Sequence, residues 1–137
     1  MTIILSIKPQ FTNLILDGRK TIEMRTKIGK NFINGATILI YSSSPTKAIV
    51  AAVKIDRIQK LKKNEVTKQH LKKIHISEQF FNDYMREKEN CYLIEIKDIN
   101  RLKHPISLLE LKSLGFTAPQ SFCYANESVQ KLINRQV

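Results

Sequence analysis

One short stretch, DGRKTIEMR at residues 17–25, carries side chains whose types and spacing could do chemistry. If the stretch is a strand, Thr21, Glu23 and Arg25 lie on one face, because successive side chains point to opposite faces. Lys20 then falls on the other, more apolar face. The polar face is either a weak ion pair open to solvent, or the wall of a pocket in which a guanidinium binds a phosphate or base. The residues alone leave both interpretations open.

A tyrosine, a lysine and a serine form a second candidate set: Tyr41, Lys47 and Ser121. Tyr41 ends one predicted strand and Lys47 begins the next, so a tight hairpin over SSSPT would bring their side chains close. Such a set can support phosphoryl transfer without an acidic cluster. Lysine stabilises the negative charge that develops on phosphorus, while the hydroxyl groups position or relay a proton. The alternative is an ordinary strand-end tyrosine, a surface lysine and a loop serine.

The composition predicts one basic, folded domain spanning residues 1–137. Of the 137 residues, 42% are hydrophobic and 26% charged, which suits a single packed core. Lys plus Arg number 23 and Asp plus Glu 12, so the formal net charge is +11. This imbalance favours a polyanionic partner such as single-stranded RNA or a nucleotide. A lysine-rich, soluble surface is the plain alternative.

The cysteines and the first residues predict a cytoplasmic protein that does not associate with membranes. Cys91 and Cys123 lack C-x-x-C spacing and are expected to be free thiols in a reducing compartment. The apolar run at residues 3–5 is too short for a signal peptide or a membrane span. The oligomeric state is not predicted.

No metal site or cofactor motif is predicted. The three histidines, His70, His75 and His104, have no ligand spacing with carboxylates or cysteines. There is neither a Walker A loop nor a dinucleotide fingerprint. A single divalent ion that bridges to a phosphate of the ligand remains an open alternative.

The predicted elements do not alternate as βαβ units. Strands are expected at residues 2–7, 20–25, 36–43, 47–61 and 91–102, and helices at 9–18, twice within 64–86, at 107–116 and at the end of the chain. Asn64 and Ser77 are expected to cap the two middle helices, and residues 117–124 to form a loop. The small residues on one face of 47–61 suit a curved sheet. This pattern favours an α+β, mainly β protein, a mixed barrel with helices packed outside.

Three blocks of this sequence resemble the ASCH domain family of PUA-like β-barrels. The first is LSIKPQFTNLILDGRKTIEMR, which contains G-x-K-x-x-E-x-R as Gly18, Lys20, Glu23 and Arg25; the others are IYSSSPTKAIVAAVKI and PISLLELKSLGFTAPQSFCY. Together they span most of residues 3–124. The resemblance implies a mixed barrel of about five to six strands with flanking helices. It also implies that the three charged residues line a cleft beside the first helix that binds RNA or a nucleotide.

The blocks are most similar to the ASCH branch associated with cleavage of single-stranded RNA. In that branch a Tyr/Lys/Ser set is catalytic, and the matching positions here are Tyr41, Lys47 and Ser121. Phe122 and Tyr124, next to this serine, are the preferred platforms for base stacking. The resulting hypothesis is an RNA-binding ASCH-domain protein, with ribonuclease activity on single-stranded RNA as the activity to test.

Two alternatives remain at this point. One is a non-catalytic RNA-binding regulatory module with the same cleft. The other is an amidohydrolase of a modified nucleoside such as N4-acetylcytidine, as in another ASCH branch that uses a lysine and a threonine on the second strand. Lys20 matches that lysine, but Glu23 stands at the threonine position, and a carboxylate does not replace an activated hydroxyl. Thr21 is two residues away from the required place.

Overall fold

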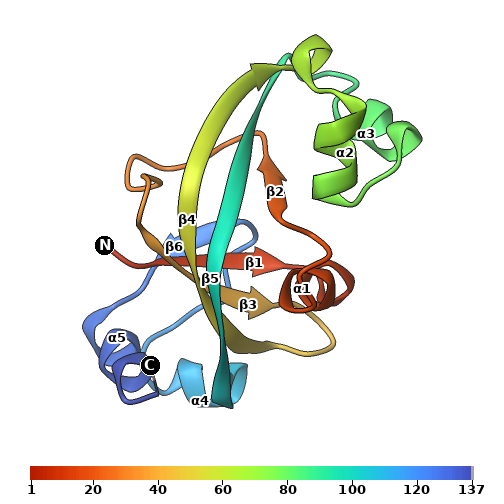
Figure 1. Ribbon diagram of the computed structural model, residues 1–137. Coiled ribbons are helices and arrows are strands. Elements are labelled where there is room, and N and C mark those ends of the chain that lie inside the picture. The colour runs from red at the N-terminus through yellow and green to blue at the C-terminus, as the bar shows by residue number, and fades with distance from the viewer. Residues whose placement is uncertain (137) are drawn as a thin grey trace.

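A strongly curved sheet of six strands organises residues 1–136, the part of the chain that this computed structural model describes (Figure 1). The strands are β1 (Ile3–Ile7), β2 (Ile22–Arg25), β3 (Thr37–Ser42), β4 (Ala48–Lys62), β5 (Asn90–Ser107) and β6 (Phe122–Tyr124). Their order across the sheet is β2-β5-β4-β3-β1-β6. Only the β1–β3 pair is parallel among these, so the sheet is mixed. It curls into a half-barrel with β2 and β6 at its edges, which confirms the predicted fold class.

The helices lie around this half-barrel: α1 (Pro9–Leu16), the short 3-10 helix η1 (Lys63–Glu65), α2 (Lys68–Ile74), α3 (Glu78–Tyr84), α4 (Leu108–Lys112) and α5 (Glu127–Asn134). In Figure 1, α2 and α3 lie at one end of the long β4–β5 ribbon, and α4 and α5 at the other. None of the helices in the described part of the chain is long and apolar enough to cross a bilayer.

Local sequence signals explain most helix ends. Pro9 occupies the first turn of α1, where its missing N–H costs nothing. Gly18, just past that helix, has a φ of 78°, a conformation that glycine adopts without strain. The Ser77 hydroxyl accepts a hydrogen bond from the backbone N–H of Phe80, as predicted for the cap of α3.

Two local predictions were wrong. Asn64 does not cap α2: it lies inside η1, and Thr67 caps the helix by accepting a hydrogen bond from the N–H of His70. Part of the predicted loop, Phe122–Tyr124, is a strand, because these residues pair with the free edge of β1. A strand of three residues carries too little pattern to be seen in the sequence, and a distant partner decides it.

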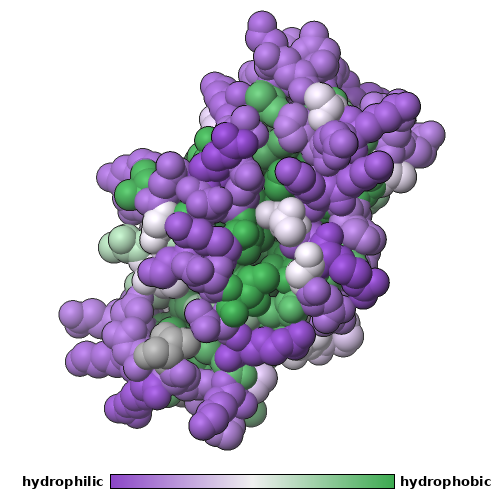
Figure 2. Space-filling model, in the orientation of Figure 1, coloured by the Kyte–Doolittle hydropathy of each residue, from purple (hydrophilic) through white to green (hydrophobic). Residues whose placement is uncertain are grey.

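The sheet is apolar on both faces because each face is covered. Leu5 and Ile40 point into the half-barrel, whereas Ile4 and Leu39 pack outward against the helices at the C-terminal end of the chain. Strand β3, predicted to be central and covered, lies between β4 and β1 and is buried on both sides. A third cluster fixes α2 and α3 to the end of β2 and β5. Figure 2 shows the outcome on one face, a mostly hydrophilic surface with a central band of apolar residues.

The segment after β2 crosses to the other edge of the sheet and packs on β6. The Phe32 ring meets the Phe122 ring edge-on, with centroids 4.9 Å apart. Gly29 lies so close to β6 that an added Cβ would be 2.3 Å from the Tyr124 hydroxyl. Both aromatic residues of β6 are therefore half-buried parts of the interior.

Candidate functional site

Lys20 lies just before β2, and its buried ammonium group holds three elements together. Its Nζ donates to the carbonyl oxygens of Ile22, at 2.9 Å, and of Ile74 at the end of α2, at 2.7 Å. The same nitrogen lies 3.3 Å from Oε1 of Glu23. An ammonium group has three donors, so all of them are engaged inside the protein. Because β2 begins only at Ile22, the strand alternation does not apply to Lys20, and its side chain joins Glu23 instead of the apolar face.

Arg25 contacts the other oxygen of the same carboxylate. Its Nε donates to Oε2 of Glu23 at 2.8 Å, and its Nη2 donates to the backbone oxygen of Ser6 at 2.7 Å. Its Nη1 reaches the Oγ of Ser121 at 3.3 Å. A continuous polar chain therefore runs from Lys20 through Glu23 and Arg25 to Ser121, across the gap between the two sheet edges.

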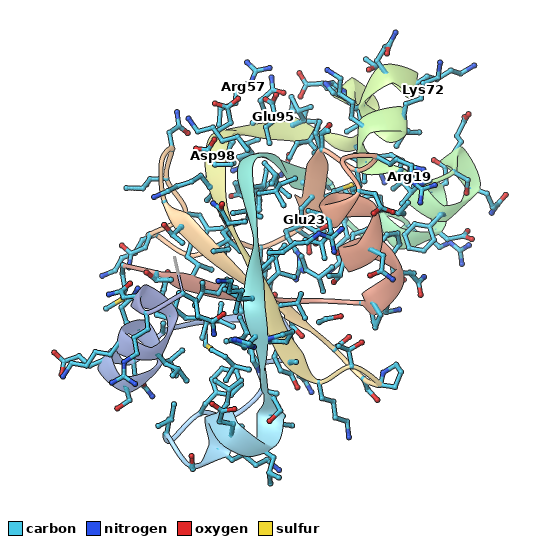
Figure 3. All side chains as sticks on the ribbon, turned by 60° about the horizontal axis from the view of Figure 1, so that its bottom comes forward. Arg19, Glu23, Arg57, Lys72, Glu95 and Asp98 are labelled. Atoms are coloured by element: carbon cyan, nitrogen blue, oxygen red, sulfur yellow. The ribbon has the colours of Figure 1, made fainter. Side chains whose placement is uncertain are left out.

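The cluster has a defined electrostatic balance, one carboxylate between two cations. Burial lowers the pKa of Lys20 from its usual value, and the nearby Glu23 carboxylate opposes that shift in part. The side chains of Lys20 and Glu23 are only 3% and 10% exposed. In Figure 3, Glu23 lies between β2 and α1 and not at the periphery, in contrast to the exposed Arg57–Glu95 pair.

A pocket of about 510 Å³ opens above this cluster. The residues that line it come from the ends of β1 and β3, from α1, β2, α3 and the segment before β6: Ser6, Ile7, Lys8, Phe11, Lys20, Glu23, Met24, Arg25, Ser43, Ile74, Ile76, Phe80, Tyr84, Pro119 and Gln120. The volume falls in the range typical of small-molecule sites. Lys20, Glu23 and Arg25 thus share one pocket.

The sheet brings the second candidate set to the end of β1 and β3 that borders this pocket. Ser6 of β1 is the cross-strand partner of Tyr41 on one side, and its N–H donates to the oxygen of Ser121 on the other, at 2.9 Å. Tyr41 and Ser121 are therefore two strand spacings apart, about 10 Å between their backbones. Lys47 enters β4 at the same end, with its N–H 3.4 Å from the oxygen of Ser43. Ser6 and Ser43 both line the pocket.

The three side chains differ in environment and form no hydrogen bond with one another within residues 1–136. The Tyr41 ring is buried against Phe116, at 5.8 Å between centroids, and burial raises the pKa of its hydroxyl. Lys47 is exposed, with a φ of 51°. Ser121 is exposed, and its hydroxyl is held by Arg25.

The pocket exposes aromatic residues other than the preferred pair. Phe122 and Tyr124 pack in the interior and do not line it, whereas Phe11, Phe80 and Tyr84 do. The helical spacing of Phe80 and Tyr84 places both on one face of α3, a signal that the sequence contained. Its interpretation required knowing that α3 lies beside the pocket.

No metal centre is apparent among the described residues: no three side chains of His, Cys, Asp or Glu gather within residues 1–136. The two cysteines are free, as predicted, with Cys91 buried and Cys123 half-buried. Burial raises the pKa of both thiols. A single divalent ion that bridges to a phosphate of the bound ligand stays a prediction.

Comparison with known proteins places the chain in a family. The crystal structure of ASCH from Zymomonas mobilis matches it with a TM-score of 0.88 and 27% identity, covering 99% of this chain and 96% of that one. A protein named ASCH domain-containing ribonuclease, from the same species, is 28% identical over 134 residues, 96% of this chain and 89% of that protein. Residues 1–115 match the family described as "Domain of unknown function (DUF365)". The chain belongs to this DUF365 family, and it is an ASCH-domain protein.

Three more solved structures are similar to this chain. Mutants of the Zymomonas ASCH protein, one with a serine changed to alanine and one with a tyrosine changed to phenylalanine, match this chain at 26% identity with TM-scores of 0.88. The N-terminal domain of Staphylothermus marinus McrB matches with a TM-score of 0.63 at 9% identity, covering 99% of this chain and 94% of that one. At that identity the likeness concerns the fold alone.

Proposed function

We propose that this ASCH-domain protein binds single-stranded RNA and cleaves it, with Lys47, Tyr41 and Ser121 at the reacting phosphodiester. The main support is the strand register, which brings Tyr41 and Ser121 to the same level of the sheet, at the end where Lys47 enters β4. The relative from Zymomonas mobilis is named a ribonuclease. A serine and a tyrosine were the residues changed in two crystallised forms of the Zymomonas ASCH protein. The net charge of +11 suits a polyanionic substrate.

The proposed reaction uses the RNA's own 2′-hydroxyl as the nucleophile. Its oxygen attacks the adjacent phosphorus, the bond from phosphorus to the 5′-oxygen breaks, and the products are a 2′,3′-cyclic phosphate and a 5′-hydroxyl end. The 2′-proton passes to water. The Tyr41 phenol, kept protonated by its raised pKa, gives its proton to the departing 5′-oxygen and regains one from water. The Lys47 ammonium group stabilises the charge that develops on the phosphate oxygens.

Ser121 acts in this scheme as a hydrogen-bond donor. Its Oγ already accepts a hydrogen bond from the Arg25 guanidinium, so its own proton is free to point toward a phosphate oxygen. Arg25, held in turn by Glu23, fixes the orientation of that hydroxyl. Arg25 is thus a positioning residue.

The amidohydrolase alternative gains nothing from the contacts of Lys20. All three donors of that ammonium group are engaged by Ile22, Ile74 and Glu23, and the neighbouring hydroxyl that such chemistry needs is replaced by the Glu23 carboxylate. The non-catalytic RNA-binding module shares every feature of the cleft. Activity alone separates it from a ribonuclease.

The test is a cleavage assay on a labelled single-stranded RNA, with and without a chelator. Lys47→Ala, Tyr41→Phe and Ser121→Ala are each expected to lower the rate by about 10²- to 10⁴-fold, the scale for loss of acid–base or charge stabilisation. Lys72→Ala is the matched control, since Lys72 projects from α2 into solvent, far from β1 and β3 (Figure 3). A strand with 2′-deoxyribose at the cleaved position is expected to resist cleavage.

Three results would contradict the proposal in different ways. Binding without cleavage by the wild type would leave the regulatory module. Cleavage that survives in Lys47→Ala would indicate another site or a contaminant. Cleavage of the 2′-deoxy strand would overturn the cyclic-phosphate route. Loss of cleavage on chelation, by contrast, would leave the proposal standing and assign a role to a divalent ion.

A further inference from the structure

Two large aromatic side chains are exposed side by side on α3. Phe80 is 46% exposed and Tyr84 is 42% exposed. Their rings are nearly parallel, with an angle of 11° and centroids 6.3 Å apart. A contiguous exposed apolar patch is a typical feature of a binding groove or an interaction site. Both line the 510 Å³ pocket.

A third ring continues this wall into the depth of the pocket. Phe11 of α1 meets Phe80 edge-on, with centroids 6.3 Å apart and an angle of 68°. The Lys20 ammonium group lies 5.2 Å from the Phe11 centroid on the inner side. The wall therefore leads from open solvent to the charged cluster and joins α1 to α3.

The inner end of the pocket is poorly suited to a phosphate group. Lys20 has no donor left, because its three hydrogens are engaged by protein oxygens. The Glu23 carboxylate beside it repels an anion, and most of the Arg25 guanidinium is already paired with protein oxygens. A flat, uncharged ring that stacks on aromatic side chains is better suited to a pocket whose lining combines aromatic rings with charged groups that are already paired.

We propose that the Phe11–Phe80–Tyr84 wall is a subsite for one unstacked nucleobase of the bound RNA. This inference rests on the proposed function and assigns the pocket to the base instead of the phosphate. The base enters the pocket and stacks on the exposed face of Phe80 or Tyr84. The phosphates stay outside, beside Lys8 at the rim and Lys47. Because Ser6 and Ser43 connect the pocket to the Tyr41 level of the sheet, the base belongs to a nucleotide next to the cleaved bond.

The experiment measures stacking directly, with a single-stranded RNA that carries one 2-aminopurine, whose fluorescence is quenched by stacking. The protein carries Tyr41→Phe throughout, so that the strand stays intact. Binding is expected to quench the fluorescence when the probe occupies the subsite. Adding Phe80→Ala or Tyr84→Ala is expected to remove the quenching and to weaken binding by about 5- to 100-fold, the scale for loss of one stacked base. Adding Tyr84→Phe, which retains the ring, is expected to preserve both.

Salt dependence and a control variant complete the test. Removing a stacking ring changes no phosphate contact and therefore no counterion release. Phe80→Ala is expected to lower the affinity for RNA without changing the slope of log affinity against log salt concentration, whereas Lys8→Ala lowers that slope by about one charge. Leu109→Ala, which removes an 83% exposed side chain on α4, is expected to change nothing. Binding without quenching at any probe position, or unchanged affinity in Phe80→Ala and Tyr84→Ala, would overturn the base subsite while RNA binding stands. Absence of RNA binding by the wild type would overturn the proposed function as well.

Discussion

Replacing Lys20 by methionine tests whether the polar cluster holds the fold together. Methionine keeps the length and apolar stem of the side chain but removes the ammonium group. Lys20 is 2% exposed, so no solvent can replace what is lost. The variant leaves the carbonyl groups of Ile22 and Ile74 without their donor and leaves Glu23 with one cation instead of two.

The expected loss of unfolding free energy follows from these contacts. A buried group left without its hydrogen-bond partner costs about 1–3 kcal/mol, and breaking a buried ion pair about 3–5 kcal/mol. Against this, the variant no longer has to desolvate an ammonium group. The net loss is therefore placed at about 3 kcal/mol, the low end of the range for a buried pair. For a domain of this size that lowers Tm by roughly 12 °C.

The assay is equilibrium denaturant unfolding at neutral pH of the wild type, Lys20→Met, Glu23→Gln and the double variant. The double variant is expected to lose about 1–2 kcal/mol less than the sum of the single losses, because Glu23→Gln removes the carboxylate that Lys20→Met strands. Lys72→Met, an exposed lysine on α2, serves as control and is expected to stay within about 0.5 kcal/mol of the wild type. A loss below about 1 kcal/mol in Lys20→Met, or strictly additive losses, would refute the claim that this cluster is structural.

Three further predictions follow from particular contacts. Burial lowers the pKa of Lys20 below its usual 10.5, so the folded protein loses this proton before the unfolded chain does. The stability of the wild type relative to Lys20→Met should therefore rise with pH in the alkaline range that ends at 10.5, and paired unfolding curves that show a fall would contradict this. Gly29→Ala should lower the free energy of unfolding by about 1–3 kcal/mol, since the added Cβ would meet the Tyr124 hydroxyl. The loss should be smaller in a Tyr124→Phe background. Equal losses in the two backgrounds, measured by thermal melts, would argue against this contact. Arg25→Gln and Ser121→Ala should each lower kcat for RNA cleavage more than they change KM. The double variant should cleave no more slowly than the slower of the two single variants. Multiplicative losses of kcat in the double variant would show that Arg25 does not act through Ser121.

The sequence predicted the fold class because each element carries its own pattern. Pro9 and Gly18 bound α1, Ser77 caps α3, and β3 is apolar on both faces because it is central. The G-x-K-x-x-E-x-R motif then predicted that three charged residues share a cleft, and all three line the pocket. The start of α2 was predicted wrongly because two residues of a type that caps helices, Asn64 and Thr67, lie near it, and Thr67 is the one that caps it.

The pocket contacts could not be read from local patterns. Strand alternation placed Lys20 on the face opposite to Glu23, yet the strand starts two residues later and the ammonium group reaches Glu23 and the end of α2. Phe122 and Tyr124 were predicted to be free platforms, but the edge of β1 recruits them into a strand. Phe80 and Tyr84 became the exposed wall because α3 packs beside α1.

The sequence by itself therefore determined most of the elements, though not β6, together with the curvature of the sheet and the residue types available for chemistry. Periodicity, caps and motifs are local, and they act through neighbours along the chain. Only the tertiary structure decided which donors are already used and which side chains meet a ligand. Those properties depend on pairs such as Lys20 with Ile74 and Arg25 with Ser121, which are 54 and 96 residues apart in the chain. Burial makes the contact between Lys20 and Ile74 strong, since a buried charge must find its partners within the protein.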